Sequence, residues 1–166
     1  MPVFNEKDNL SRLESELVKF INSTVFETKV LLINDGSTDG SEDIINKICK
    51  KNDFFESVSF IKNSGLSSAL KAGFDLCNSE YIGYIDADLQ TSPSDFHILL
   101  KYIDQYDLIT GYRSNRKDSY LKNISSLVAN GIRNIFTNDG VNDTGCPLKV
   151  IKTDFAKRIP MFKGLH

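Results

Sequence analysis

Apolar residues recur along this chain with two different periods, and segments of the two kinds alternate. The helical period is clearest near the start, at Leu10, Leu13, Leu17 and Ile21, and it predicts an amphipathic helix over residues 9–22. Short apolar runs bounded by polar or turn-forming residues predict buried strands at residues 29–34, 58–61, 81–85 and 107–110. Over its first two thirds the chain therefore alternates between helices and strands.

Further helices are predicted between these strands. Asp39 and Glu42 have the spacing of a capping box, which predicts a helix with an apolar face of Ile44, Ile45 and Ile48. Residues 67–77 have helical periodicity, and Ser92 followed by Pro93 has the cap-then-proline form that opens another helix. Because parallel strands need crossover helices, this order predicts an α/β fold with a largely parallel sheet sandwiched by helices. The length of 166 residues fits a single domain.

Acidic loops follow two of the predicted strands. Asp86-Ala87-Asp88-Leu89-Gln90 comes directly after the strand at 81–85, and Asn34-Asp35-Gly36-Ser37 ends the strand at 29–34. Ligands bind at the carboxyl ends of strands in parallel sheets, so both loops are expected at one rim. Two carboxylates and an amide oxygen suit Mg²⁺ or Mn²⁺ rather than zinc or copper. The alternative for the first loop is a polar turn without a ligand.

Composition narrows the class of protein. The net charge of −2 combines an acidic stretch, residues 1–110, with a basic one, residues 111–166. A basic surface attracts phosphates or anionic lipid head groups, unless these are ordinary solvated faces. The three cysteines have no disulfide or zinc spacing, which favours a reducing, cytosolic environment. Nothing indicates a nucleic-acid partner, and no apolar run approaches the roughly 18 residues of a membrane-spanning helix.

Residues 119–137 carry a long apolar stripe, with Arg116, Lys122 and Arg133 near or along it. The pattern is typical of a basic amphipathic helix that lies on a membrane surface. It is equally typical of an ordinary helix that faces the core and keeps its basic residues in solvent.

Four motifs in order resemble the inverting family 2 glycosyltransferases with the GT-A nucleotide-diphospho-sugar transferase fold. They are Pro2-Val3-Phe4-Asn5-Glu6, Asn34-Asp35-Gly36-Ser37-Thr38-Asp39, Asn63-Ser64-Gly65 and Asp86-Ala87-Asp88-Leu89-Gln90. In the second half, Gly111-Tyr112-Arg113, Arg116, Asp118-Ser119 and Asp143-Thr144-Gly145-Cys146 are similar to the polyprenyl-phosphate branch, which includes dolichol-phosphate mannose synthase.

The resemblance implies a donor site for a UDP- or GDP-sugar. The residues expected to bind the donor are Pro2, Phe4, Asn5, Glu6, Asp35, Gly36, Ser37, Asn63 and Asp86. Asp86, Asp88 and Gln90 are expected to hold Mg²⁺ or Mn²⁺ against the two donor phosphates, as the hard oxygen ligands of this loop also suggest. Leu66 stands where the family often has Lys or Arg, so no donor contact is assigned to it.

The resemblance also implies an acceptor and a reaction. Arg113 and Arg116 are expected to face the phosphate of a polyprenyl (dolichyl or undecaprenyl) phosphate, because a guanidinium can pair with two oxygens. Together with Asp88 and Asp143 they form the expected catalytic set. Asp143 would act as a base or orient the acceptor, unless it only forms a turn before Gly145. The expected reaction is transfer of a hexose with inversion, at the cytosolic face of a membrane.

In similar proteins an apolar strand precedes the first motif, and membrane-associated helices follow the part that matches His166. Residues 1–166 are therefore expected to be one catalytic domain truncated at both ends, in a protein that can form homo-oligomers. Two other functions compete with this one. The first is a fragment that binds nucleotide sugars without turnover. The second is a metal-dependent phosphatase with an Asp nucleophile, although Gln90 stands where that loop needs Thr or Val.

Overall fold

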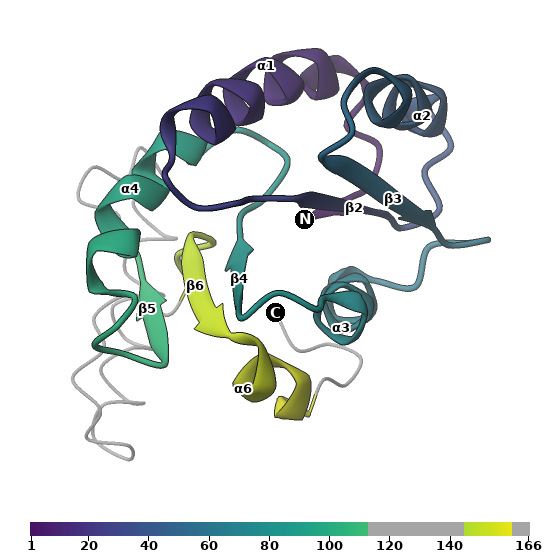
Figure 1. The fold of residues 1–166 in the computed structure, drawn as a ribbon. Coiled ribbons are helices and arrows are strands. Elements are labelled where there is room, and N and C mark those ends of the chain that lie inside the picture. Colours follow the sequence, from purple (N-terminus) through teal and green to yellow (C-terminus); the bar gives the residue numbers. More distant parts are fainter. Residues whose placement is uncertain (113–144, 161–166) are drawn as a thin grey trace, which may run out of the picture.

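The structure is a computed structural model that describes residues 1–112 and 145–160 (Figure 1). Its first half contains β1 (Pro2–Val3), α1 (Lys7–Ser23), β2 (Val30–Asn34), α2 (Ser41–Lys51), β3 (Phe55–Ser59), α3 (Leu66–Leu76) and β4 (Tyr81–Tyr84). The 3₁₀ turn η1 (Pro93–Asp95), α4 (Phe96–Leu99), the 3₁₀ turn η2 (Leu100–Tyr102) and β5 (Leu108–Thr110) follow. After the region that is not described come β6 (Lys149–Lys152) and α6 (Thr153–Arg158). The predicted helix at 119–137 lies outside the described residues.

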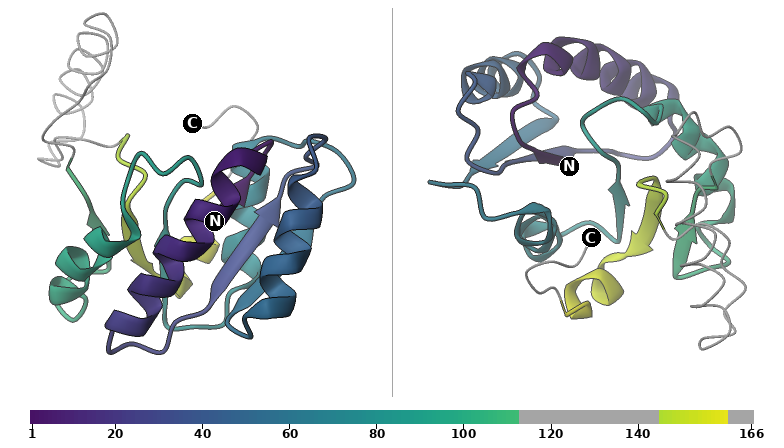
Figure 2. Two further views of the ribbon diagram at one scale, coloured as in Figure 1. Left: turned by 90° about the horizontal axis from the view of Figure 1, so that it is seen from above. Right: turned by 180° about the vertical axis from the view of Figure 1, so that it is seen from behind.

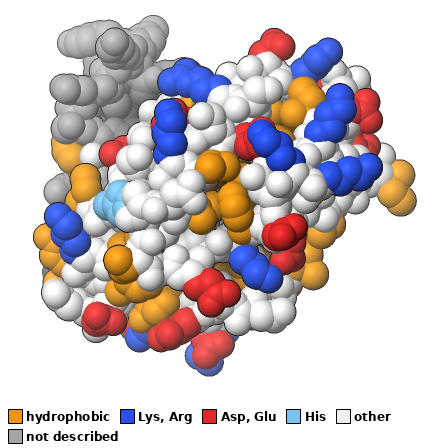
Figure 3. Space-filling view, turned by 45° about the horizontal axis from the view of Figure 1, so that its top comes forward, with side chains coloured by type: hydrophobic (Ala, Val, Ile, Leu, Met, Phe, Trp, Pro, Cys, Tyr) orange, Lys and Arg blue, Asp and Glu red, His pale blue; other side chains and the backbone are white. Residues whose placement is uncertain are grey.

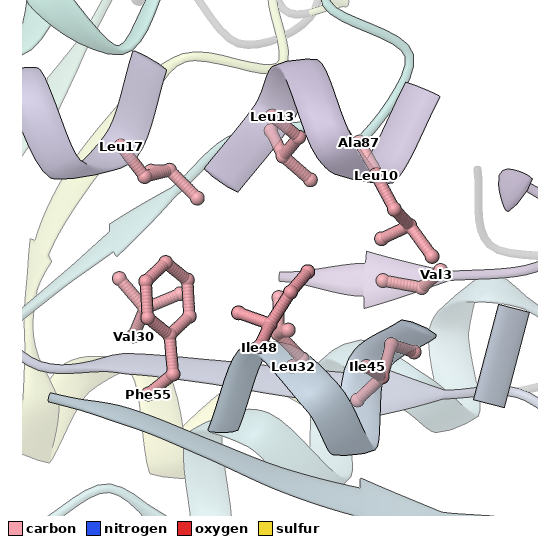
Figure 4. Close-up of a cluster of buried hydrophobic side chains, with 10 residues drawn as sticks. All are labelled: Val3, Leu10, Leu13, Leu17, Val30, Leu32, Ile45, Ile48, Phe55 and Ala87. Atoms are coloured by element: carbon pink, nitrogen blue, oxygen red, sulfur yellow. The ribbon is translucent and has the colours of Figure 1, made fainter. Parts of the chain in front are cut away.

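A parallel three-stranded sheet is built from the first half of the chain, in the order β1-β2-β3. Helices α1 and α2 cover one of its faces and α3 covers the other (Figure 1). The first face holds the main apolar cluster, with Val3, Leu10, Leu13, Leu17, Val30, Leu32, Ile45, Ile48, Phe55 and Ala87 (Figure 4). Viewed from above, α1 and α2 lie side by side over the strands (Figure 2). The amphipathic helix predicted from the spacing of Leu10, Leu13 and Leu17 is thus confirmed, because these residues pack on one face of the sheet.

A second sheet has the order β4-β6-β5, and β6 runs antiparallel to both of its neighbours. The expectation of a parallel sheet therefore holds for β1–β3, whereas β6 reverses the direction in this part of the fold. Apolar residues of α4 pack on one face of this sheet, and Ala156 of α6 packs with Ile82 and Ile151. Neither β6 nor α6 was predicted, because a four-residue strand with a lysine at each end has almost no apolar signature.

Two local predictions were wrong. The strand expected at 58–61 is β3, Phe55–Ser59, because its pairing with β2 runs from Val30 opposite Phe55 to Asn34 opposite Ser59. Ile61 lies beyond that pairing and is fully exposed. The capping box is also absent, since α2 begins at Ser41 after Gly40, whose φ is 93°. The Asp39 carboxylate accepts hydrogen bonds from both the backbone N–H and the hydroxyl of Ser41.

A cavity of about 730 Å³ lies beside Met1, between β2 and β4. Mostly apolar side chains line it, among them Leu17, Phe20, Leu31, Phe74, Ile82 and Phe96. The short β1 pairs only with the last two residues of β2, and among the described strands β4 is an edge strand on the side away from β6. The Met1 ammonium donates a hydrogen bond to the Leu31 carbonyl at 2.8 Å, and burial lowers its pKa to about 6.

On the face formed by α1 and α2, acidic and basic side chains are interspersed (Figure 3). Lys51 of α2 pairs with Glu14 of α1 at 2.9 Å, and Lys19 pairs with Glu16 at 2.8 Å within α1. In the part of the chain that the structure describes, no helix combines the length and the apolar character needed to cross a membrane.

Candidate functional site

The first and second motifs are joined by hydrogen bonds at the rim of the parallel sheet. The Asn5 N–H donates to the Ser37 hydroxyl at 3.0 Å, and the Asn5 carboxamide oxygen accepts from the Thr38 N–H at 2.9 Å. Asn5 has a φ of 54°, a conformation that asparagine tolerates better than most residues. The Glu6 N–H donates to the Ser41 hydroxyl at 3.0 Å. The predicted donor residues Asn5, Glu6 and Ser37 therefore belong to one connected unit, and the Phe4 side chain beside them is 44% exposed.

Asp35 joins this unit to the third motif. Its carboxylate accepts the Ser64 N–H at 2.7 Å and the Gly65 N–H at 2.9 Å, and the residue is only 3% exposed. Hydrogen bonds from backbone amides stabilise a carboxylate that burial would otherwise disfavour. In this structure Asp35 holds the loop that carries Asn63, so both of its oxygens already have partners within the chain. A direct contact between Asp35 and a ligand stays a prediction.

Gly36 lies where the two loops cross. A Cβ atom at this position would sit 2.4 Å from the Lys62 carbonyl carbon and 2.5 Å from the Asn63 nitrogen, both of them backbone atoms. The φ of Gly36 is +68°, so its conformation also favours glycine. The glycine of the second motif therefore allows Asn63 to approach the Asp35 loop. Three of the predicted donor residues, Asp35, Gly36 and Asn63, are brought together here.

The fourth motif forms a loop directly after β4. Ala87 in its centre is buried and packs in the main apolar cluster with Val3 and Leu10, which brings the loop to the end of β1 (Figure 4). The Asp88 carboxylate accepts the Gln90 N–H at 3.0 Å, and Leu89 has a φ of 59°. The predicted cation ligands Asp86, Asp88 and Gln90 thus share one loop, which is anchored beside the first motif.

The surroundings of Asp86 shift the pKa of its carboxylate. Burial raises its pKa, and the nearby Asp88 charge raises it further. The Tyr84 hydroxyl, which lies 2.5 Å from Asp86 Oδ1, and the Lys149 ammonium act in the opposite direction. Two adjacent carboxylates in a partly buried loop repel each other, and a divalent cation would relieve that repulsion. The residues present therefore fit a hard cation such as Mg²⁺ or Mn²⁺.

The donor set for such a cation is small. Within the described ranges, no three or more His, Cys, Asp and Glu residues gather into a metal site. The loop offers a cation two carboxylates and the Gln90 side chain, and the remaining positions would be filled by water or phosphate oxygens, as is usual for Mg²⁺.

The predicted acceptor residues Arg113 and Arg116 lie outside the described residues, as does Asp143. The structure shows two residues near the site that were missed. The apolar run at 81–85 predicts Tyr84 only as part of a strand, although a residue two positions before Asp86 points to the same side of the sheet. Lys149 belongs to the unpredicted β6, where it pairs with Tyr84, and no pattern along the sequence connects it with Asp86.

Residues 1–158 match the model of the family described as Glycosyl transferase family 2. The undecaprenyl-phosphate 4-deoxy-4-formamido-L-arabinose transferase of Edwardsiella ictaluri is 30% identical over 159 residues, which cover 95% of this chain and 49% of the relative. The dodecaprenyl-phosphate galacturonate synthase of Rhizobium johnstonii is 28% identical over 172 residues, covering 100% of this chain and 50% of the relative. The chain spans about half the length of these curated relatives.

Among solved structures, glucosyl-3-phosphoglycerate synthase from Mycobacterium tuberculosis, in complex with Mn²⁺ and UDP-glucose, has a TM-score of 0.71. The sequence identity is 16%, and the match covers 96% of this chain and 57% of that one. This likeness confirms the fold expected from the motifs, an α/β fold of the GT-A type.

Replacing Gly36 by alanine is expected to destabilise the protein by about 3 kcal/mol, because the added methyl group meets backbone atoms and the φ is unfavourable. Gly40→Ala is the matched control. Gly40 also has a positive φ, +93°, in the left-handed region, but a Cβ atom there meets only the Lys7 side chain, at 3.9 Å, so a loss of only about 1 kcal/mol is expected. Urea unfolding of both variants measures the difference. Equal losses would show that crowding at Gly36 is unimportant.

Replacing Asp86 by asparagine is expected to stabilise the protein without divalent cations, raising the Tm by about 2 °C at pH 7. A raised pKa means that the folded state binds the proton more tightly than the unfolded state. Ionised Asp86 therefore costs stability at neutral pH, and this cost disappears as the pH falls through the raised pKa. Thermal unfolding in EDTA at pH 7 and pH 4 tests this. Asp104→Asn, at an exposed position, should leave the Tm nearly unchanged.

Proposed function

Since this chain belongs to the glycosyl transferase family 2, we propose that it forms the catalytic domain of an enzyme that moves a sugar from a nucleotide-diphosphate donor to a polyprenyl phosphate. The observation that carries the proposal is the joining of the four motifs at one rim. The Asn5–Ser37 and Asp35–Ser64 hydrogen bonds connect three of them, and buried Ala87 brings the two carboxylates of the fourth beside the first. The printed names of the two curated relatives describe sugar transfer to polyprenyl phosphates.

The donor is proposed to bind over the joined loops. Exposed Phe4, together with Asn5, Glu6 and Ser37, offers an aromatic face and polar groups to a base and ribose. Asp35 contributes through the position of the Asn63 loop, because its own oxygens already accept two backbone N–H groups. UDP-glucose is bound with Mn²⁺ in the similar synthase, which supports a nucleotide sugar as donor without fixing the base for this chain.

Asp86, Asp88 and Gln90 are proposed to hold the divalent cation. When bound, such an ion neutralises the charge that develops on a departing diphosphate. The residues of the chain have the complementary task of holding the donor in line with the acceptor, which accounts for much of the acceleration in reactions of this kind. Mg²⁺ and Mn²⁺ both suit these oxygen ligands.

The acceptor side is proposed from the resemblance. Arg113 and Arg116 would pair with the acceptor phosphate, and Asp143 would orient it. A phosphate with a second pKa near 6 is already an anionic nucleophile at neutral pH, so a strong general base is unnecessary. Attack of its oxygen on the anomeric carbon breaks the bond to the nucleoside diphosphate and inverts the configuration. This reaction belongs at a membrane surface on the cytosolic side, where a polyprenyl phosphate presents its head group.

Residues 1–166 are proposed to be one domain of a longer protein. The chain spans about half the length of the two curated relatives, which supports this. Homo-oligomers are proposed as well, as the resemblance implies. The family match favours sugar transfer over the phosphatase, whereas the binding fragment remains the second candidate because half of each relative has no counterpart here.

Calorimetric titration of UDP, GDP and their sugar conjugates should show binding of one nucleotide that depends on Mn²⁺. Asp88→Ala is expected to weaken this binding at least about tenfold, because loss of one charged ligand removes much of the affinity for the cation. Asp104→Ala, which removes an exposed carboxylate away from the loop, is the control and should bind as the parent chain does. Folded protein without affinity for any of these nucleotides would refute the donor site.

A chain extended at both ends should transfer radiolabelled sugar to undecaprenyl phosphate, and Arg113→Ala should reduce the rate at least about tenfold through loss of a bidentate phosphate contact. Lys122→Ala removes a charge from the same basic stretch outside the expected acceptor residues and serves as the control. Nucleotide binding without transfer from any donor would instead support the binding fragment.

A further inference from the structure

One side chain holds the Asp86 carboxylate, and the proposed function does not use it. Tyr84 is the last residue of β4, paired opposite Lys149 of β6. Its hydroxyl oxygen lies 2.5 Å from Asp86 Oδ1. In this hydrogen bond the hydroxyl donates and the carboxylate oxygen accepts. Hydrogen bonds to an ionised group are the shorter and stronger kind.

The pairing of β4 with β6 fixes the position of Tyr84 next to Asp86. The Tyr84 backbone belongs to the antiparallel pair of β4 with β6, and the residue is partly buried and lines the cavity beside Met1. Asp86 comes two residues later, beyond the last paired position of β4. Side chains two residues apart along a strand point the same way, which explains why the hydroxyl reaches the carboxylate. The orientation of Asp86 is therefore fixed by a side chain and not by the pairing of the strand.

Asp88 is held in a similar way. Its Oδ1 accepts the Gln90 N–H at 3.0 Å, as Asp86 Oδ1 accepts the Tyr84 hydroxyl. Each carboxylate thus uses Oδ1 for a donor of the chain, and among the described residues no hydrogen-bond donor reaches either Oδ2, which leaves that oxygen for another ligand. Each of the two carboxylates can therefore bind the same cation through one oxygen. A small hard cation accepts such monodentate carboxylates.

We propose that Tyr84 is a positioning residue of the cation site, whose hydroxyl orients Asp86 so that its second oxygen faces the cation shared with Asp88. The inference rests on the proposed function, because it requires a divalent cation at this loop. It adds a residue outside the four motifs to the site. Partners that orient a metal-binding side chain commonly change the metal affinity by about 10- to 100-fold when they are removed.

The test is direct Mn²⁺ binding, with no catalysis involved. Free Mn²⁺ is measured from its electron paramagnetic resonance signal during titration of the chain, with and without UDP. Tyr84→Phe keeps the ring and removes only the hydroxyl, and it should bind Mn²⁺ about tenfold more weakly. Tyr81→Phe is the matched control, because Tyr81 lies on the same strand and its hydroxyl is not the one that donates a hydrogen bond to Asp86. Its affinity should stay within about twofold of the parent chain.

The outcomes separate this inference from the proposed function. Parent chain that is folded and binds no Mn²⁺ would overturn both. If the parent chain binds Mn²⁺ and Tyr84→Phe binds it equally well, the positioning role is overturned while the donor site stands. The same holds if Tyr84→Phe lowers the Tm but leaves the affinity unchanged, because the hydroxyl would then serve only stability. In an Asp86→Ala background, where the Tyr84 hydroxyl has no side chain to orient at position 86, Tyr84→Phe should cause no further loss of Mn²⁺ affinity, and an undiminished loss there would also overturn the role.

Discussion

The geometry of the site depends first on the buried carboxylate of Asp35. Placed at the end of β2, it accepts two backbone N–H groups from the loop before α3, at 2.7 and 2.9 Å. A buried charge without partners would be very costly, so these two hydrogen bonds and the burial of Asp35 require each other. Gly36 permits the close crossing that they need, since any larger residue would collide with the backbone of Lys62 and Asn63. The polar groups of Asn5 and Ser37 then have a fixed support.

The proximity of Asp86 and Asp88 is a second constraint, and it lowers the stability of the fold. The loop after β4 places Asp86 and Asp88 close enough for the charge of one to raise the pKa of the other, in a place where burial already disfavours ionisation. Without a cation this arrangement reduces stability, and the surrounding structure must hold it. Ala87 does so by packing in the apolar cluster that also contains Val3 and Leu10, and Tyr84 and Gln90 each donate a hydrogen bond to one carboxylate. Such local cost at a functional loop is common, because binding sites are selected for their ligand and not for stability.

The sequence predicted those parts of the fold whose signals are local. Helix α1 was found because three leucines repeat with its period, and the acidic loops were found because each follows an apolar strand. Strand β3 was misplaced because its limits are set by pairing with β2, which brings in Phe55 and excludes Ile61. Strand β6 was missed because its position depends on contacts with β4 and β5, which are far from it in sequence. The proximity of Lys149 to Asp86 could not be predicted either, because Lys149 lies on this strand.

The site also lies where the two sheets meet. The first motif and the Asp35 loop belong to β1 and β2, whereas Asp86 and Asp88 follow β4 of the second sheet. Away from the rim the cavity beside Met1 separates β2 from β4, but at the rim Ala87 belongs to the same buried apolar cluster as Val3. A ligand that contacts both groups of loops must therefore bridge the two sheets. A ligand stabilises the state that it binds. A ligand that contacts both groups of loops would therefore favour the arrangement in which the two sheets lie together at the rim. The relative position of the two sheets is then what decides whether the four motifs act together.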